Sequence, residues 1–309
     1  MLHLRAISPP ERTEDTLARL REHPGTAHLV LHRGAALAPA GDLIEADVAR
    51  EAADEIIDLL CAAGLEKEGG VTLEAIDTVL SDAADRAEER APGDGADAVV
   101  WRELVARTGE ESRLNGTFQA FLAIACLLAS VGVITDSPVT IVGAMVVGPE
   151  FGPLAGIAVG LVLRQWGLVR RASLALAVGF PVAMVVTALA TLASEAIGLL
   201  DVASFRQGRP DVDFVYQVGW YSLIVAVLAG AAGMLAMTSA KSAALVGVFI
   251  SVTTVPAAGY AIVAAVTGEW ARAGESAAQL VVNLTGIVAA AGAVLAVRRR
   301  GQLDRSWGK

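Results

Sequence analysis

The sequence predicts an α-helical membrane protein in which six spans follow a small α+β domain. Hydrophobic residues make up 54% of the 309 residues and charged residues 18%, whereas about 25% charged residues is usual in soluble proteins. The charge is also divided unevenly. Residues 1–114 contain 12 Lys and Arg against 24 Asp and Glu, and residues 115–309 contain 12 against 9. An acidic, water-compatible head of net charge −12 therefore precedes an apolar body of net charge +3.

This composition excludes several classes of protein. The high apolar content excludes a disordered chain, and two cysteines, Cys61 in the head and Cys126 in the body, are too few for a disulfide scaffold. The acidic head excludes a basic nucleic-acid-binding protein, so no nucleic acid is expected among the partners.

The head is expected to be a ferredoxin-like domain, because its predicted elements follow the order β-α-β-β-α-β of a split βαβ fold. Alternation of apolar and polar residues predicts the strands, and apolar residues on one face predict the helices, the first with Thr13 as a candidate N-cap. The elements are expected at 2–8 (strand), after Pro10 (helix), 27–33 and 42–48 (hairpin), 50–63 (helix) and 70–76 (strand).

Acidic helical segments interrupted at 91–95 follow the head and are interpreted as a linker to the membrane. We therefore expect a cytoplasmic domain at 1–76, an acidic helical linker at 77–114, a six-span transmembrane domain at 115–298 and a basic cytoplasmic tail at 299–309.

Six apolar runs are long enough to cross a bilayer, because a helix rising 1.5 Å per residue needs about 20 residues to cross about 30 Å of hydrocarbon. Only one charged residue, Glu150, lies inside any of them. The runs are 117–134, 137–163, 172–194, 214–240, 242–268 and 276–297.

The distribution of Lys and Arg predicts the orientation, since positive residues near span ends stay in the cytoplasm. With the head inside, both termini are cytoplasmic and the protein lies in the cell membrane with the lipid bilayer as a partner. The outer loops then carry only Arg206, Arg209 and Arg272. The inner segments carry Arg107, Arg113, Arg164, Arg170, Arg171, Lys241, Arg298, Arg299, Arg300, Arg305 and Lys309.

The second run contains the strongest candidate for a functional site. Pro149 and Pro153 each remove an amide donor, which predicts a broken helix around 148–153. Glu150 lies at the middle of the run, where a charge costs about 2.5–3.5 kcal/mol and usually faces an interior path or a partner. Such a carboxyl group would suit proton exchange or cation binding; the alternative is a protonated carboxyl that serves only to bind helices together.

Glycines recur every fourth residue along this run, which gives one helix face no side chains and lets another backbone approach closely. That partner could lie in the same chain or in a second copy, so a homo-oligomer is compatible with the sequence. The glycines are Gly148, Gly152, Gly156 and Gly160.

The fifth run repeats part of this pattern. Pro153 and Gly156 correspond to Pro256 and Gly259, and Val142 and Gly143 correspond to Val246 and Gly247, at offsets of 103 or 104 residues. The match pairs the second of the first three runs with the second of the last three, and three spans per half make the two halves inverted. Inverted repeats with interrupted helices point to a transporter site at the midplane.

Further polar residues could line such a site. Thr253 and Thr254 precede Pro256, and Asn283 lies in the sixth run. Threonine often bonds its own helix, whereas a buried asparagine is costlier and so carries more weight. The expected solute- or ion-binding residues are Glu150, Gly148, Pro149, Gly152, Pro153, Thr253, Thr254, Pro256 and Asn283.

Enzyme signatures are missing from the sequence. No P-loop, GxGxxG, HExxH or CxxC pattern occurs, and the runs contain no Ser-Lys or Asp-Asp pair, so no enzyme activity, cofactor or metal is expected. His28 and His32 would be about 13 Å apart along a strand, too far to bind one metal, and a surface or cross-strand role is expected for them.

The apolar body resembles a family of bacterial and archaeal membrane proteins known as the uncharacterised hydrophobic domain family, a domain of unknown function. The resemblance covers roughly 115–297. The head, in addition, looks like the small domain that precedes the membrane part in many members. Glu150 and the single Pro256 differ from the pattern of many members. The residues that carry the resemblance are Gly132 with Ser137, Ile141-Val-Gly-Ala-Met-Val-Val-Gly-Pro149, Gly152-Pro153, the segment from Gly247 to Pro256, and Asn283-Leu-Thr-Gly-Ile287.

Two functions are therefore considered. The first is a secondary transporter or channel-like protein that moves a small solute or ion through a midplane site at broken helices two and five. The second is a membrane-anchored sensor or scaffold whose head binds a ligand or a protein partner.

Overall fold

The computed structural model describes residues 1–309 except 77, 92–97, 207–211, 213–218, 240–253 and 307–309. Its contacts divide the chain into two compact units. One consists mainly of Met1–Glu103, and the other mainly of Leu104–Met237 and Ser242–Gln302.

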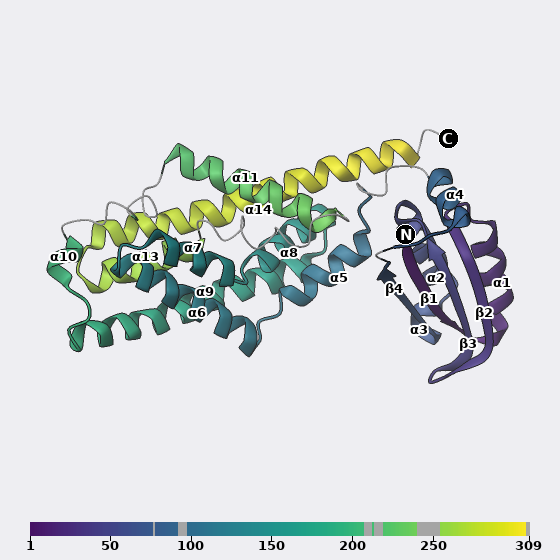
Figure 1. The fold of residues 1–309 in the computed structure, drawn as a ribbon, viewed down its shortest axis with the longest axis horizontal. Helices are drawn as coiled ribbons and strands as arrows, with labels where there is room; N and C mark the ends of the chain where they lie inside the picture. The colour runs from purple at the N-terminus through teal and green to yellow at the C-terminus, as the bar shows by residue number, and fades with distance from the viewer. Residues whose placement is uncertain (77, 92–97, 207–211, 213–218, 240–253, 307–309) are drawn as a thin grey trace. The chain divides into compact units, whose positions relative to one another are not determined.

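The head is a four-stranded antiparallel sheet with helices packed on one face (Figure 1). The strands lie in the order β2-β3-β1-β4, and every neighbouring pair is antiparallel. The elements are β1 (Leu2–Ser8), α1 (Pro10–Glu22), β2 (Thr26–Leu37), β3 (Ala40–Val48), a 3-10 turn (Arg50–Ala52), α2 (Ala53–Ala62), α3 (Leu65–Glu68) and β4 (Gly70–Ala75). The β-α-β-β-α-β order of strands and main helices is the predicted one, with α3 as an additional short helix.

The alternation along the strands produces the core of the head. Leu4, Ile44 and every second neighbour along β1 and β3 point to the same face and are buried, because successive side chains on a strand point to opposite faces. Leu20 of α1 and Ile56 of α2 close this core from the helical side.

Two local predictions in the head differ from the structure. The first helix begins at Pro10, and Thr13 is buried in its first turn, where its hydroxyl donates to the Pro9 carbonyl oxygen (3.2 Å); the prediction of Thr13 as N-cap is wrong. Proline suits the first helical position because its fixed φ is helical. An amide N–H at that position would have no acceptor within the helix, so its absence costs nothing. The hairpin strands are also longer than predicted, since the ladder continues to Leu37 and Ala40.

The membrane-capable part contains four helices that are long and apolar enough to cross a bilayer, or five if the bent pair α7 and α8 forms one span, among the described residues. The single helices are α6 (Gly116–Ile134), α9 (Trp166–Ala196), α11 (Trp220–Thr238) and α14 (Trp270–Ser306). The fifth predicted run is described only as α13 (Thr254–Val266), which is 13 residues long, because 240–253 lie outside the described residues.

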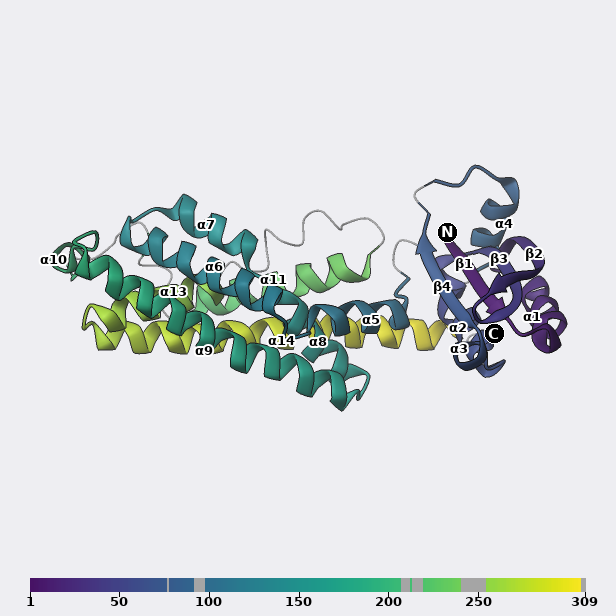
Figure 2. The ribbon, with the colours of Figure 1, turned by 90° about the horizontal axis from the view of Figure 1, so that it is seen from below.

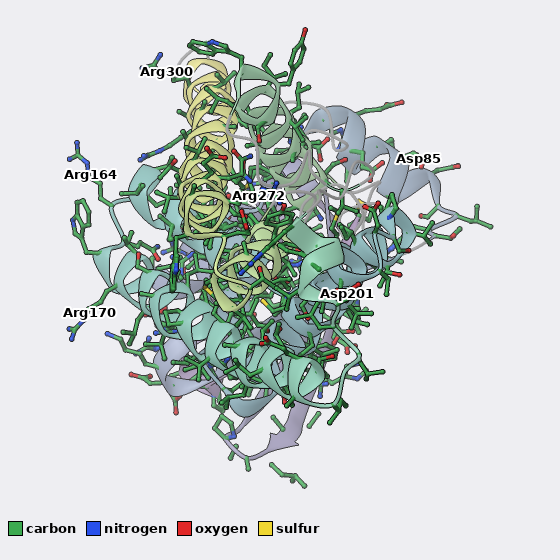
Figure 3. All side chains as sticks on the ribbon, turned by 90° about the vertical axis from the view of Figure 1, so that its left-hand side faces the viewer. Asp85, Arg164, Arg170, Asp201, Arg272 and Arg300 are labelled. Atoms are coloured by element: carbon green, nitrogen blue, oxygen red, sulfur yellow. The ribbon has the colours of Figure 1, made fainter. Side chains whose placement is uncertain are left out.

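Helical structure continues beyond the predicted spans at both ends of the body. The predicted linker contains α4 (Asp82–Arg90) and α5 (Trp101–Glu111), and α14 runs on into the predicted basic tail. Arg164 lies at the turn between α8 and α9, and Arg170 lies on α9. Both side chains project outward from the ribbon, as expected for charged residues at the end of a span (Figure 3).

Helix boundaries in the body recur with a constant spacing. Gly116 and Trp220 begin helices of 19 residues each and are 104 residues apart. The same spacing separates the end of α8 at Val162 from the end of α13 at Val266. It also separates the start of α9 at Trp166 from the start of α14 at Trp270. The turns between them also match: Gln165 N donates to Gly160 O and Glu269 N donates to Ala264 O, both at 2.8 Å.

Candidate functional site

The predicted break in the second run is confirmed. Helix α7 (Pro138–Val147) and helix α8 (Phe151–Val162) are bent by 53° relative to each other. Gly148 and Pro149 lie in the break, and Pro153 is the third residue of α8, where an amide donor has no intrahelical acceptor to bond. The two prolines therefore interrupt the helix without leaving unpaired backbone groups in the middle of either segment.

Glu150 is the N-cap residue of α8 and its side chain is fully buried. The hydroxyl of Thr254, at the start of α13, donates a hydrogen bond to Oε1 of Glu150 at 2.6 Å. The second carboxyl oxygen, Oε2, has no hydrogen-bond partner among the residues that the structure describes. A buried carboxyl group with one free oxygen is able to accept a proton or a ligand there.

Gly148 makes room for this carboxyl group. A Cβ atom at Gly148 would overlap Oε2 of Glu150 and would lie 3.0 Å from a methyl group of Val255. Any other residue at position 148 would have to displace the carboxyl group, so the glycine is required by the position of Glu150.

Two glycines on one face of α8 approach the end of α5, which the sequence indicated only as part of a linker, whereas Gly160 on the same face approaches Val169 of α9. A Cβ at Gly152 would lie 2.5 Å from Cβ of Glu111, and one at Gly156 would lie 2.5 Å from Oγ of Ser112. Figures 1 and 2 both show α5 beside α8. The signal that could have revealed this contact is the pair Thr108 and Ser112, two small residues one turn apart that are both fully buried.

Other glycines also find their partners within the chain. A Cβ at Gly230 of α11 would lie 2.5 Å from the carbonyl oxygen of Ile287 on α14, and one at Gly259 of α13 would lie 2.8 Å from Cβ of Ala129 on α6. These close approaches lie within one chain, whereas an added Cβ at Gly143 of α7 or at Gly274 or Gly292 of α14 would meet nothing within 4 Å.

A pocket of about 380 Å³ opens at the break. Its charged wall consists of two ion pairs, Arg107 Nε to Glu111 Oε1 at 3.2 Å and Arg113 Nε to Glu110 Oε2 at 3.1 Å. The remaining lining residues are the apolar Phe118, Phe121, Phe151 and Met237, the polar Asn115 and Thr117, and Gly148, Pro149 and Gly152 of the break.

The predicted site residues thus fall into three groups. Gly148, Pro149 and Gly152 line the pocket, Glu150 and Pro153 are buried and do not line it, and Thr254 is bonded to Glu150. Pro256 is buried in the first turn of α13. Thr253 lies outside the described residues.

Asn283 is part of a polar group on α14. It is fully buried, and its Oδ1 accepts a hydrogen bond from Gln279 Nε2 at 3.1 Å. One turn before Gln279, Ser276 donates to the carbonyl oxygen of Ala257 on α13 at 2.8 Å. The same short helix α13 therefore bonds Glu150 at its first residue and α14 at its fourth.

A second polar cluster lies on the head. His28 and His3 both bond Asp47, at 2.6 and 2.9 Å, and the other ring nitrogen of His28 bonds Ser81 Oγ at 2.7 Å. His32 lies 3.5 Å from Glu45, so His28 and His32 contact different carboxylates across the strands, in line with the predicted cross-strand role. Among the described residues no group of three or more His, Cys, Asp or Glu could hold a metal ion.

The histidines determine how Asp47 titrates. Burial raises the pKa of Asp47, but the hydrogen bonds from His28 and His3 outweigh it and hold the pKa below its ordinary value. A carboxyl group whose pKa is lower in the folded than in the unfolded state stabilises the fold above the unfolded pKa, about 3.9, and this contribution disappears as the pH falls through the folded pKa.

Asp47→Asn is therefore expected to destabilise the head at pH 5 but not near pH 2. Pepsin cleavage of the full chain at matched pH values measures this, expressed as the ratio of the variant's rate to the wild-type rate. The ratio should exceed one at pH 5 and approach one near pH 2. Glu74→Gln, which changes an exposed carboxylate of β4, serves as the control, and a ratio for Asp47→Asn that does not change with pH would contradict the assignment.

Comparison with known proteins identifies one family. Residues 145–289 match the model of a domain of unknown function (DUF389), which confirms the resemblance over this range. No curated protein and no solved structure matches the chain. The matched range contains Glu150, Thr254 and Asn283.

Proposed function

Because the DUF389 model that residues 145–289 match has no assigned function, we propose from the site itself that this is a secondary transporter or channel-like protein. It moves a small solute or ion through a site at the helix break. The observation that carries the proposal is the carboxyl group of Glu150, which is fully buried at the break of an apolar helix pair. One of its oxygens is bonded to Thr254, and the other has no partner among the residues that the structure describes. Ionisable residues in such a position are costly and mark ion or substrate pathways.

The proposed topology has six spans in the cytoplasmic membrane, with both termini in the cytoplasm. Five apolar segments support it directly, and α13 with the apolar residues before it supplies the sixth. The positive residues Arg164 and Arg170 fall on the proposed inner side, together with the Arg-rich end of α14.

The spans are proposed to form a 3+3 inverted repeat. The constant spacing of 104 residues between helix boundaries supports this arrangement, and Glu150 and Thr254 are themselves 104 residues apart. At this spacing Glu150 and Thr254 are equivalent, whereas the proline match, at 103 residues, pairs Glu150 with Thr253. Either pairing places the contact between Glu150 and Thr254 close to the pseudo-two-fold axis that relates the halves. In an inverted repeat this axis runs in the membrane plane, so their hydrogen bond would lie near the midplane.

The head is proposed to be a ferredoxin-like domain that regulates or assembles the transporter. Its strand order β2-β3-β1-β4, with helices on one face, supports the split βαβ arrangement.

The proposal is tested in liposomes that contain the full chain and a dye for H⁺, Na⁺ or K⁺. We expect at least one of these ions to enter faster than in protein-free liposomes when a membrane potential drives it inward. Equal rates for all three ions with and without protein would contradict a carrier or channel role for the Glu150 site.

A second function is favoured by the polar chain of Ser81, His28 and Asp47 on the head. In this second function the protein is a membrane-anchored sensor or scaffold, and this surface of the head binds a ligand. Ligand binding by residues 1–103, together with no ion movement by the full chain, would support this function over transport.

A further inference from the structure

We propose that the ion exchanged at Glu150 is the proton, and that it reaches the carboxyl group from the pocket beside α5 by passing Gly148. This inference rests on the proposed function only in taking Glu150 as the functional group. It adds the identity of the ion and the side from which the ion arrives.

The first step is the short separation between pocket and carboxyl group. Gly148 lines the pocket, and Oε2 of Glu150 occupies the space that a Cβ of Gly148 would fill. A single residue without a side chain therefore separates the free oxygen from the pocket. A small movement of the broken segment 148–150 would bring water into contact with Oε2.

The surroundings of Oε2 favour a proton over a metal cation. Metal cations such as Ca²⁺ and Mg²⁺ need about six or more oxygen ligands. Among the described residues no group of three or more His, Cys, Asp or Glu is placed to hold a metal ion, and Oε2 of Glu150 has no hydrogen-bond partner there. A proton requires only the one free oxygen and also cancels the charge whose burial is costly.

The exchange is a simple proton transfer. A hydronium ion in the pocket gives one proton to Oε2 and becomes water, while the Thr254 hydroxyl continues to donate to Oε1. Transfer from Oε2 to a water molecule is the reverse step. No electron moves, and the carboxyl group alternates between neutral and singly negative.

The charged groups around this path are few. In the pocket the charges of Arg107 and Arg113 are balanced by Glu111 and Glu110, so the wall is polar but close to neutral. The thiol of Cys126 on α6 is buried and titratable but carries no charge as a thiol. A polar wall of this kind holds water, which is what delivery of protons to the break requires.

The test follows the proton on Glu150 by infrared spectroscopy of the full chain in lipid. The carbonyl stretching band of the protonated carboxyl group is identified by its loss in Glu150→Gln. Transfer into D₂O shifts this band, and the rate of the shift measures access of water to the carboxyl group. Gly148→Ala is expected to slow the shift at least about ten-fold. Gly143→Ala on the adjoining helix α7, where an added Cβ meets nothing within 4 Å, should leave it unchanged.

The side of access is tested with a pair of threonines at opposite ends of α6, in a Cys61→Ala background. Thr117 lines the pocket, whereas Thr135 is exposed at the other end of the helix. After each is replaced by cysteine and modified with a bulky thiol reagent, exchange should slow only for Thr117→Cys. This pair keeps the proposal testable even if Gly148→Ala fails to fold.

Three outcomes would overturn the proposal: no band that depends on Glu150, equal exchange rates in all variants, or slowing only at Thr135→Cys. Fast exchange with no ion flux in liposomes would leave the inference standing and would reject the transport function, so the two failures are distinguishable.

Discussion

Glu150→Gln is expected to lower the ion flux of the reconstituted chain about a hundred-fold, the scale on which removal of a positioned proton-transferring side chain acts in catalysis. Glutamine has nearly the same shape, and its carbonyl oxygen can still accept the Thr254 hydrogen bond, so the fold should persist. The amide, however, can neither take up a proton at physiological pH nor carry a charge. Flux into dye-loaded liposomes, measured against pH, provides the readout.

The matched control is Glu195→Gln, which makes the same change at an exposed carboxylate on α9 and should leave the flux unchanged. Equal and equally pH-dependent flux for wild type and Glu150→Gln, in a variant shown to fold, would reject Glu150 as the carrier.

Gly156→Leu is expected to release α5 from α8. A Cβ at Gly156 would lie 2.5 Å from Oγ of Ser112 and 3.3 Å from Cβ of Ala172, so the rest of a leucine side chain has no space unless α5 moves. Overpacking of a tight contact typically costs 1–3 kcal/mol, which corresponds to about 5- to 150-fold faster opening. Hydrogen–deuterium exchange of the α5 amides, followed by mass spectrometry, measures this rate.

Gly143→Leu is the control, because it adds the same side chain to α7 at an exposed glycine. If α5 exchanged at the wild-type rate in Gly156→Leu, the packing of α5 on the glycine face would be disproved. Because α5 also forms the charged wall of the pocket, its release should change water access to Glu150 as well.

Local sequence patterns predicted much of the architecture. The alternation in the head placed its strands and its core, since the period of two decides which side chains face inward. Pro149 and Pro153 predicted the break in the second run, because a missing amide donor acts on its own helix wherever that helix lies. The prediction of Thr13 as N-cap of the first helix was wrong, because Pro10 is the stronger signal for a helix start.

Other features were beyond local patterns. The acidic and helical composition of 77–114 indicated a linker, yet Thr108 of α5 and Ser112 just after it are buried beside Gly156 of α8. Asn283 was grouped with Glu150 because both are polar residues in apolar runs, and the structure bonds it to Gln279 on its own helix. The periodicity of one segment shows which of its faces is apolar, but it does not show which helix packs against that face.

The sequence by itself determined the apolar body with its acidic head, the position of the break and the one carboxyl group inside an apolar run. These follow from composition and from backbone chemistry, which act locally. Only the tertiary structure decided that Glu150 meets Thr254, that Gly148 yields its side-chain space to the carboxyl group, and that α5 completes a pocket there. Such contacts join residues up to 104 positions apart, and they depend on how helices cross, which the packing of the whole unit settles.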